Sequence, residues 1–121
     1  MKNAGKLRAL EYLEHILEAI KNIDEYTADM TEVSFLEDRR TQDAVIRNLE
    51  IMGEACNNIV KYHSDFASYH QKIPWGFAYE MRNVLAHGYH KVDLEIVWKT
   101  IEKDLPPLAE HIVSIKKEEQ N

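Results

Sequence analysis

Residues 93–115, DLEIVWKTIEKDLPPLAEHIVSI, contain the clearest periodic pattern of the chain. Apolar side chains recur there every three or four positions, at Leu94, Val97, Ile101, Leu105, Leu108, Ile112 and Ile115. This spacing places them on one face of an α-helix, and the aspartate that opens the segment is a residue type that caps helix N-termini. Pro106 and Pro107 lack backbone donors, so the sequence predicts a kink near Asp104 or Leu105.

Two further amphipathic helices are expected earlier in the chain. The first spans roughly residues 5–28 and has an apolar stripe at Leu10, Leu13, Leu17, Ile20 and Ile23. The second is expected to begin at Thr41, an N-cap type, and to end at about Tyr62. Its apolar stripe contains Val45, Leu49, Met52, Cys56 and Ile59. Between these helices, residues 31–38 are expected to form a connector with one short helical turn near Phe35.

The rest of the chain gives less regular signals. Residues 64–72 are polar and show no clear periodicity. Pro74 favours the first turn of another helix, because its missing N–H has no partner there in any case. This helix is expected to end near His87, where Gly88 can adopt the C′ conformation. The final residues 116–121, KKEEQN, are expected to fray.

These patterns together predict an all-α fold, an antiparallel four- to five-helix up-and-down bundle whose last helix is kinked at Pro106-Pro107. The chain has 121 residues with 45% hydrophobic residues, enough for one packed core, so residues 1–121 are expected to form a single domain. With only four Gly and three Pro, the sequence contains no short β-hairpin signal.

Composition excludes several classes of protein. No apolar run approaches the roughly 20 residues that span a bilayer, and charges interrupt the start of the chain, so we expect a cytoplasmic protein without a membrane segment. The single cysteine, Cys56, cannot form an internal disulfide or a thiol-rich zinc site and is expected to be buried and inert. The net charge of −6 means that any nucleic-acid contact must come from a local basic patch.

No metal site or cofactor is expected. The histidines outside the helix at 74–87 and its end share no metal-ligand spacing and are interpreted as ordinary surface or boundary residues. They are His15, His63, His70 and His111. Glu50 and Glu54 are one helical turn apart, but no Glu-x-x-His partner accompanies them, which argues against a carboxylate metal site. Trp75 and Trp98 are expected to be core or interface aromatics.

The expected helix over residues 74–87 has a polar stripe that contains Glu80, Asn83 and His87, with Arg82 at its flank. Periodicity alone favours a solvated helix face. The order of the residues adds more, because Arg82 to Tyr89 reads R-x4-H-x-Y. A pair spaced R-x4-H arises often by chance, so its weight depends on the rest of the chain.

This motif resembles the signature of the HEPN superfamily of helical nucleotide-binding and ribonuclease domains, and the wider sequence resembles its HepT-type toxins. The blocks that match, in order, are Phe35-Leu36-Glu37-Asp38, residues 44–55 (AVIRNLEIMGEA), Ile73-Pro74-Trp75, residues 81–89 (MRNVLAHGY), Val92-Asp93, Val97-Trp98 and Asp104-Leu105-Pro106. This sequence departs from the pattern at Gly88, where relatives often have an acidic residue, and at His90, where an aromatic is common. The departure at Gly88 falls at a variable position of the motif.

The resemblance implies a metal-independent endoribonuclease, the toxin of a toxin–antitoxin system. In such cleavage the RNA 2′-hydroxyl attacks the adjacent phosphate, which requires proton transfer and a cation for the developing charge. His87 suits the proton steps and Arg82 suits the phosphate, so these two are the candidate catalytic residues. Asn83 is a candidate to orient either group, and Arg47 is a candidate RNA contact, with a surface salt bridge to a neighbouring carboxylate as the alternative.

The resemblance also implies partners. In HEPN nucleases the motifs of two protomers share a cleft, so a homodimer with two copies of Arg82, Asn83 and His87 is expected. In HepT-type toxins the tyrosine matching Tyr89 receives AMP from an antitoxin of the minimal nucleotidyltransferase class, whereas a tyrosine at a helix end ordinarily packs its ring. The alternative function is a non-catalytic helical module that binds nucleotide or docks a nucleotidyltransferase.

Overall fold

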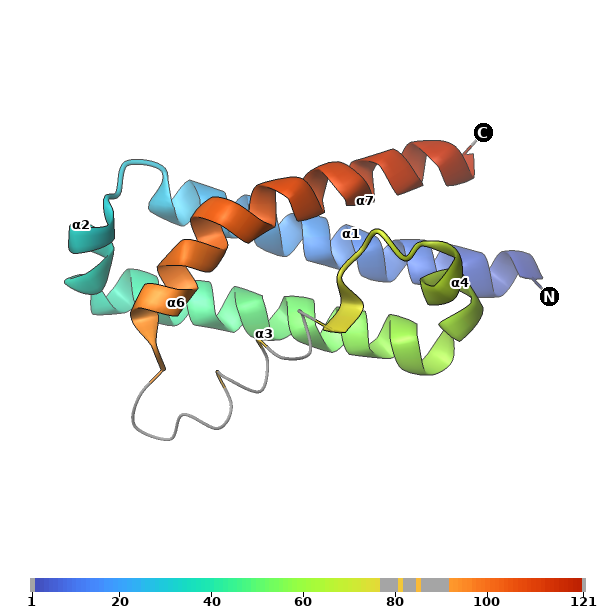
Figure 1. The fold of residues 1–121 in the computed structure, drawn as a ribbon, viewed down its shortest axis with the longest axis horizontal. Helices are drawn as coiled ribbons and strands as arrows, with labels where there is room; N and C mark the ends of the chain where they lie inside the picture. The colour runs from blue at the N-terminus through green and yellow to red at the C-terminus, as the bar shows by residue number, and fades with distance from the viewer. Residues whose placement is uncertain (1, 77–80, 82–84, 86–91, 121) are drawn as a thin grey trace.

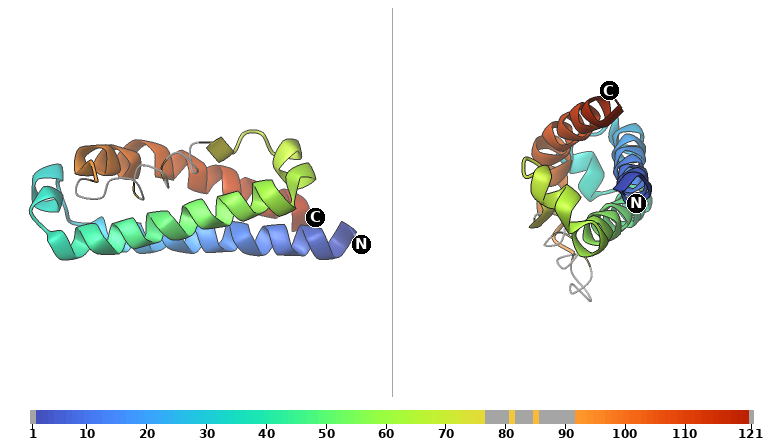
Figure 2. Two further views of the ribbon diagram at one scale, coloured as in Figure 1. Left: turned by 90° about the horizontal axis from the view of Figure 1, so that it is seen from below. Right: turned by 90° about the vertical axis from the view of Figure 1, so that its right-hand side faces the viewer.

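The computed structural model describes residues 2–76, 81, 85 and 92–120, and within this part of the chain all regular structure is helical (Figure 1). In chain order the elements are α1 (Lys2–Thr27), α2 (Glu32–Leu36), α3 (Arg39–Tyr62), α4 (Ser64–Tyr69), α6 (Leu94–Lys99), the π-helix η1 (Thr100–Asp104) and α7 (Leu105–Gln120). The long helices α1, α3 and α7 lie side by side, and α1 runs antiparallel to both others (Figures 1 and 2). The predicted all-α bundle is confirmed.

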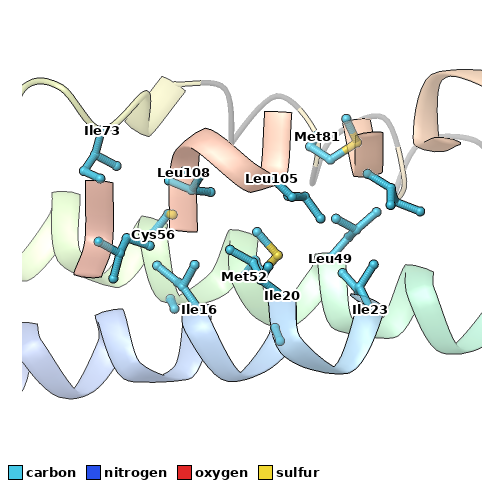
Figure 3. Packing of buried hydrophobic residues seen from close by; sticks show 14 of the residues in the cluster. Ile16, Ile20, Ile23, Leu49, Met52, Cys56, Ile73, Met81, Leu105 and Leu108 are labelled. Atoms are coloured by element: carbon cyan, nitrogen blue, oxygen red, sulfur yellow. The ribbon is translucent and has the colours of Figure 1, made fainter. Parts of the chain in front are cut away.

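The core lies between the inner faces of α1, α3 and α7 (Figure 3). Completely buried side chains include Leu13, Ile16 and Ile23 of α1 and Ile59 of α3. The apolar stripe of α1 is rotated slightly from the predicted one: Ile16 is buried, whereas the predicted members Leu10 and Leu17 are only partly buried. The hydrophobic positions at both edges of a wide stripe cannot all face the core, and packing against α3 and α7 decides which ones do.

Helix α3 begins earlier than predicted. Asp38, not Thr41, is its N-cap: the Asp38 carboxylate accepts a hydrogen bond from the backbone N–H of Thr41 at 3.0 Å and another from the Thr41 hydroxyl at 2.9 Å. These hydrogen bonds and the nearby charge of Arg40 lower the pKa of Asp38 below its ordinary value. The expected cap at Thr41 was wrong because Thr41 supplies the donors that Asp38 satisfies.

The short turn expected between the first two long helices is α2. Thr31 and Ser34 form a capping box at its start, with each side chain accepting from the other residue's backbone N–H. Phe35 is completely buried, and its ring centroid lies 5.3 Å from that of Trp98 in α6. Helix α2 therefore closes one end of the bundle, and Trp98 is the core aromatic that the sequence predicted.

The kink predicted before the two prolines is confirmed, and the backbone at this kink is the π-helix η1. Pro106 and Pro107 cannot donate to the carbonyls one turn earlier, and their rings crowd that turn. The chain widens there into the π-helix Thr100–Asp104, and the path of the helix bends between α6 and α7 (Figure 1). The Thr100 hydroxyl donates to the carbonyl of Ile96 at 2.9 Å, which adds a bond where the regular ladder is interrupted.

The expectation that the last residues fray was wrong. Helix α7 continues to Gln120, and the Glu119 carboxylate lies 3.1 Å from Lys6 Nζ of α1 and 3.2 Å from His70 Nε2. His70 is only 6% exposed, so its assignment to the surface or its boundary was wrong too. His70 and Glu119 are far apart in sequence, and no spacing rule links them.

Among the described helices, none has an apolar stretch long enough to cross a membrane.

Candidate active site

Most of the predicted site lies outside the described residues. This holds for the candidate catalytic pair Arg82 and His87, for Asn83, and for the candidate AMP acceptor Tyr89. The predicted helix end at Gly88 lies outside them as well. The structure describes the residues directly before the motif, Met81 and Leu85 beside or within it, the residues directly after it, and Arg47 on α3.

Residues 77–91 form the motif-bearing segment, of which two residues, Met81 and Leu85, are described, and both belong to the core. Met81 directly precedes Arg82, and Leu85 lies two positions before His87; they are 7% and 9% exposed. Both have helical backbone, and their spacing of four places them on one face of a helix. Figure 3 shows the Met81 side chain in the same core as Leu49 and Leu105. The motif is therefore attached to α3 and α7 through apolar packing.

The chain enters this segment through residues 71–76, which we call the connector. Ile73 is buried, and its backbone N–H donates to the carbonyl of His70 at 3.3 Å. Trp75 is half-buried and its indole Nε1–H donates to the carbonyl of Ala67 in α4 at 3.1 Å. Helical backbone begins at Trp75, directly after Pro74, as the sequence predicted. The connector residues thus determine where the motif-bearing segment begins.

The chain leaves the segment at a well-formed helix start. Asp93 is the N-cap of α6, and its carboxylate accepts from the backbone N–H groups of Glu95 at 3.1 Å and Ile96 at 3.2 Å. Val92 packs against the core just before this cap. The predicted cap at Asp93 is confirmed, so the segment leads into a helix start that the sequence predicted.

Arg47 lies on the exposed side of α3. Within the described part of the chain it forms no ion pair, and this part includes both Asp43 and Glu50, the carboxylates of the alternative interpretation. Leu49, two positions further along α3 and on the opposite face, belongs to the core that receives Met81 (Figure 3). The Arg47 side chain is thus exposed and has no carboxylate partner within the described part of the chain.

The described residues offer no metal centre. Among them no group of three His, Cys, Asp or Glu side chains converges closely enough to hold an ion, and Glu50 and Glu54 are both exposed. Cys56 is 1% exposed, and its burial raises the pKa of the thiol to about 12. A buried thiol of this kind is a poor nucleophile and a poor ligand, as expected from its position on the apolar stripe.

The sequence of the chain is similar to those of known proteins. A family profile described as "Ribonuclease HepT-like" matches residues 16–115. The "Probable ribonuclease HepT" of Thermococcus cleftensis is 44% identical over 107 residues, which cover 88% of this chain and 94% of that relative. A Methanocaldococcus jannaschii protein named "Putative RNase" is 37% identical over 114 residues, covering 91% of this chain and 92% of its own.

A second Methanocaldococcus jannaschii relative is longer. It is named "Gamma-glutamylcyclotransferase and putative RNase" and is 45% identical over 107 residues, 88% of this chain. The match spans only 47% of that relative's length. No solved structure gives a significant match. The profile covers most of the chain, including the R-x4-H-x-Y motif and the helices that hold it, and the chain therefore belongs to the HepT-like ribonuclease family.

Proposed function

We propose that this protein is a metal-independent endoribonuclease in which Arg82 and His87 are the catalytic residues. The observation that carries the proposal is an intact R-x4-H-x-Y motif inside the region that matches the ribonuclease family profile. The burial of Met81 and Leu85 supports it, because these two residues, one directly before Arg82 and one between Arg82 and His87, belong to the packed core.

The chemistry needs a proton acceptor, a proton donor and a cation, which two copies of this motif would supply. The RNA 2′-oxygen bonds to the adjacent phosphorus, the bond from phosphorus to the 5′-oxygen breaks, and the products are a 2′,3′-cyclic phosphate and a free 5′-hydroxyl. The His87 imidazole of one protomer accepts the 2′-hydroxyl proton, while the protonated His87 imidazole of the second protomer delivers a proton to the leaving 5′-oxygen. The Arg82 guanidinium stabilises the charge that develops on the phosphoryl oxygens, and Asn83 orients the reacting groups.

Two proton transfers with one motif histidine per chain favour a shared site. We propose an isologous homodimer whose cleft contains Arg82, Asn83 and His87 from both protomers. Arg47, exposed on α3 and without an ion pair among the described residues, extends the positive surface for the RNA backbone. The local placement of these cations offsets the overall net charge of −6.

We further propose that the protein is the toxin of a toxin–antitoxin pair acting in the cytoplasm. Its antitoxin is a nucleotidyltransferase of the minimal type that transfers AMP to the Tyr89 hydroxyl. A phosphate-linked nucleotide two positions after His87 adds bulk and negative charge beside the catalytic pair, which blocks RNA binding. Coexpression with the cognate nucleotidyltransferase is expected to raise the intact mass by AMP, and Tyr89→Phe is expected to escape both the modification and the inhibition.

Cleavage of total cellular RNA in excess chelator tests the nuclease itself. Arg82→Ala and His87→Ala are each expected to lower the rate by roughly 10²-fold or more, the usual contribution of a general acid–base group or an oxyanion partner. Arg8→Ala and His111→Ala remove the same residue types elsewhere in the bundle and are expected to retain the wild-type rate. Folded, unmodified wild-type dimer that leaves RNA intact would instead indicate the non-catalytic, nucleotidyltransferase-docking module.

A further inference from the structure

One carboxylate near the end of the chain holds two other parts of the molecule. Glu119 Oε2 lies 3.2 Å from His70 Nε2, and Glu119 Oε1 lies 3.1 Å from Lys6 Nζ. A carboxylate only accepts hydrogen bonds, so Nε2 of His70 carries the proton that it donates. The His70 side chain is 5% exposed and that of Glu119 is 17% exposed, which makes this pair more shielded from water than an ordinary surface ion pair.

His70 is also fixed by its ring and its backbone. Its ring centroid lies 4.6 Å from that of Phe66 and 4.9 Å from that of Tyr69. Its backbone N–H donates to the carbonyl of Phe66 at 3.1 Å, and its own carbonyl accepts from the N–H of Ile73 at 3.3 Å. His70 thus ends α4 and begins the connector at the same time.

The connector after His70 leads directly to the catalytic motif. Ile73 is anchored in the core on the side where Met81 also enters it (Figure 3), and the Trp75 indole is tied back to Ala67. A shift of His70 therefore moves the start of the segment that carries Arg82 and His87. Displacements of about 1 Å away from the reacting atoms can lower a rate by roughly 10²-fold.

We propose that His70 and Glu119 are positioning residues of the ribonuclease site: their hydrogen bond attaches the end of α7 to the connector and sets where the motif-bearing segment begins. The proposal rests on the proposed ribonuclease function for its effect on catalysis. Its structural part, that the pair holds residues 71–76 in place, stands on the contacts of His70 and Glu119 alone.

The chain contains a matched control for this pair. Lys116 of α7 forms an ion pair with Glu14 of α1, so the Glu14–Lys116 pair links α7 to α1 without touching the connector. Lys6 links Glu119 to α1 and also makes no contact with the connector through that bond. A role in tying α1 to α7 belongs to the contacts of Glu14 with Lys116 and of Lys6 with Glu119, whereas positioning belongs only to the contact of Glu119 with His70.

The test compares Glu119→Ala and Glu119→Gln with Glu14→Ala and Lys6→Met in the full-length protein. Glu119→Ala is expected to accelerate amide hydrogen exchange in residues 71–76 by roughly 10-fold and to lower kcat for RNA cleavage by about 10-fold or more at a temperature where every variant is folded. Glu119→Gln retains an oxygen acceptor for His70 and is expected to remain near wild type. Both controls are expected to leave exchange at 71–76 and kcat unchanged.

His70→Phe gives a second variant should Glu119→Ala fail to fold, because phenylalanine preserves the ring packing on Phe66 and Tyr69 while losing the hydrogen bond. It is expected to reproduce the effects of Glu119→Ala. Exchange at 71–76 or kcat that matches the Glu14→Ala control would overturn the proposal. The exchange measurement requires no RNA, so wild-type protein without nuclease activity would contradict the proposed function while exchange still decides whether the pair holds the connector.

Discussion

Asn48 is a polar residue on the apolar side of α3, and its neighbours explain its burial. It is 6% exposed, accepts a hydrogen bond from Asn22 Nδ2 at 3.1 Å and donates to the carbonyl of Ala44 at 2.9 Å. Both ends of its amide are therefore satisfied, as a buried polar side chain requires. Asn48 also connects α3 to α1 at a fixed register, which apolar packing specifies less sharply.

Replacing Asn48 by alanine is expected to lower the free energy of unfolding by about 1–2 kcal/mol, because two hydrogen bonds and their packing are lost. Urea denaturation followed by circular dichroism measures this difference. Asn57→Ala, on the same helix but partly exposed, is the matched control and is expected to change stability by less than about 0.5 kcal/mol. Equal effects of the two substitutions would show that the link between Asn48 and Asn22 contributes nothing.

Cys56 provides a test of the packing around α3. Burial raises its pKa to about 12, and at pH 8 the thiolate is then only about one part in 10⁴ of the thiol. We expect iodoacetamide to leave the native protein unmodified at pH 8 over hours and to modify it fully in guanidinium chloride, as measured by intact mass. Rapid alkylation of native protein would mean that this part of the core opens readily.

At the scale of the helices, periodicity and end signals located α1, α3, α6 and α7. They failed to predict the start of α3 and the end of α7, which depend on hydrogen bonds and ion pairs with other residues. The start of α3 depends on which of two good N-cap types finds free N–H groups, and Asp38 does. The end of α7 depends on His70 and Lys6, neither of which is near it in sequence. The sequence KKEEQN by itself contains nothing that predicts an ordered helix end.

The Asp38 cap is expected to make α3 sensitive to acid. Hydrogen bonds from Thr41 lower the pKa of Asp38 in the folded protein, so the unfolded chain binds a proton at higher pH than the folded one. The stabilisation is therefore complete above the ordinary carboxyl pKa and is lost as the pH falls through the lowered value. Asp38→Asn retains an oxygen acceptor for the cap, and we expect it to flatten the loss of stability between about pH 5 and pH 2.

Thermal unfolding over this pH range measures the effect of Asp38→Asn. Asp43→Asn, an exposed carboxylate one turn further into α3 with no hydrogen bond among the described residues, serves as the control and is expected to follow the wild-type profile. If the thermal stability of Asp38→Asn falls at low pH as steeply as that of the wild type, the acid sensitivity comes from other carboxylates, such as Glu119. Burial raises the pKa of Glu119, but its hydrogen bonds with His70 and Lys6 outweigh this and lower it.

At the scale of the whole molecule, the bundle brings a short motif onto a core built from distant helices. The sequence was sufficient to predict the all-α fold. Arg82, His87 and Tyr89 lie within one motif, which is why the sequence singles them out, and their roles stay a prediction. The sequence could not predict the support of that motif, since Met81 packs near Leu49 and Leu105 (Figure 3), and His70 is held by Glu119. Such contacts depend on tertiary packing that no local pattern encodes.

We propose that Arg82 and His87 cleave RNA through attack by the 2′-hydroxyl, without a metal ion. The most direct test of this proposal is the chemistry of the RNA ends that unmodified wild-type protein and His87→Ala produce in excess chelator. We expect 2′,3′-cyclic phosphate and 5′-hydroxyl ends with the wild type, and none above background with His87→Ala. Ends with a 3′-hydroxyl and a 5′-phosphate, or cleavage that survives His87→Ala, would contradict it.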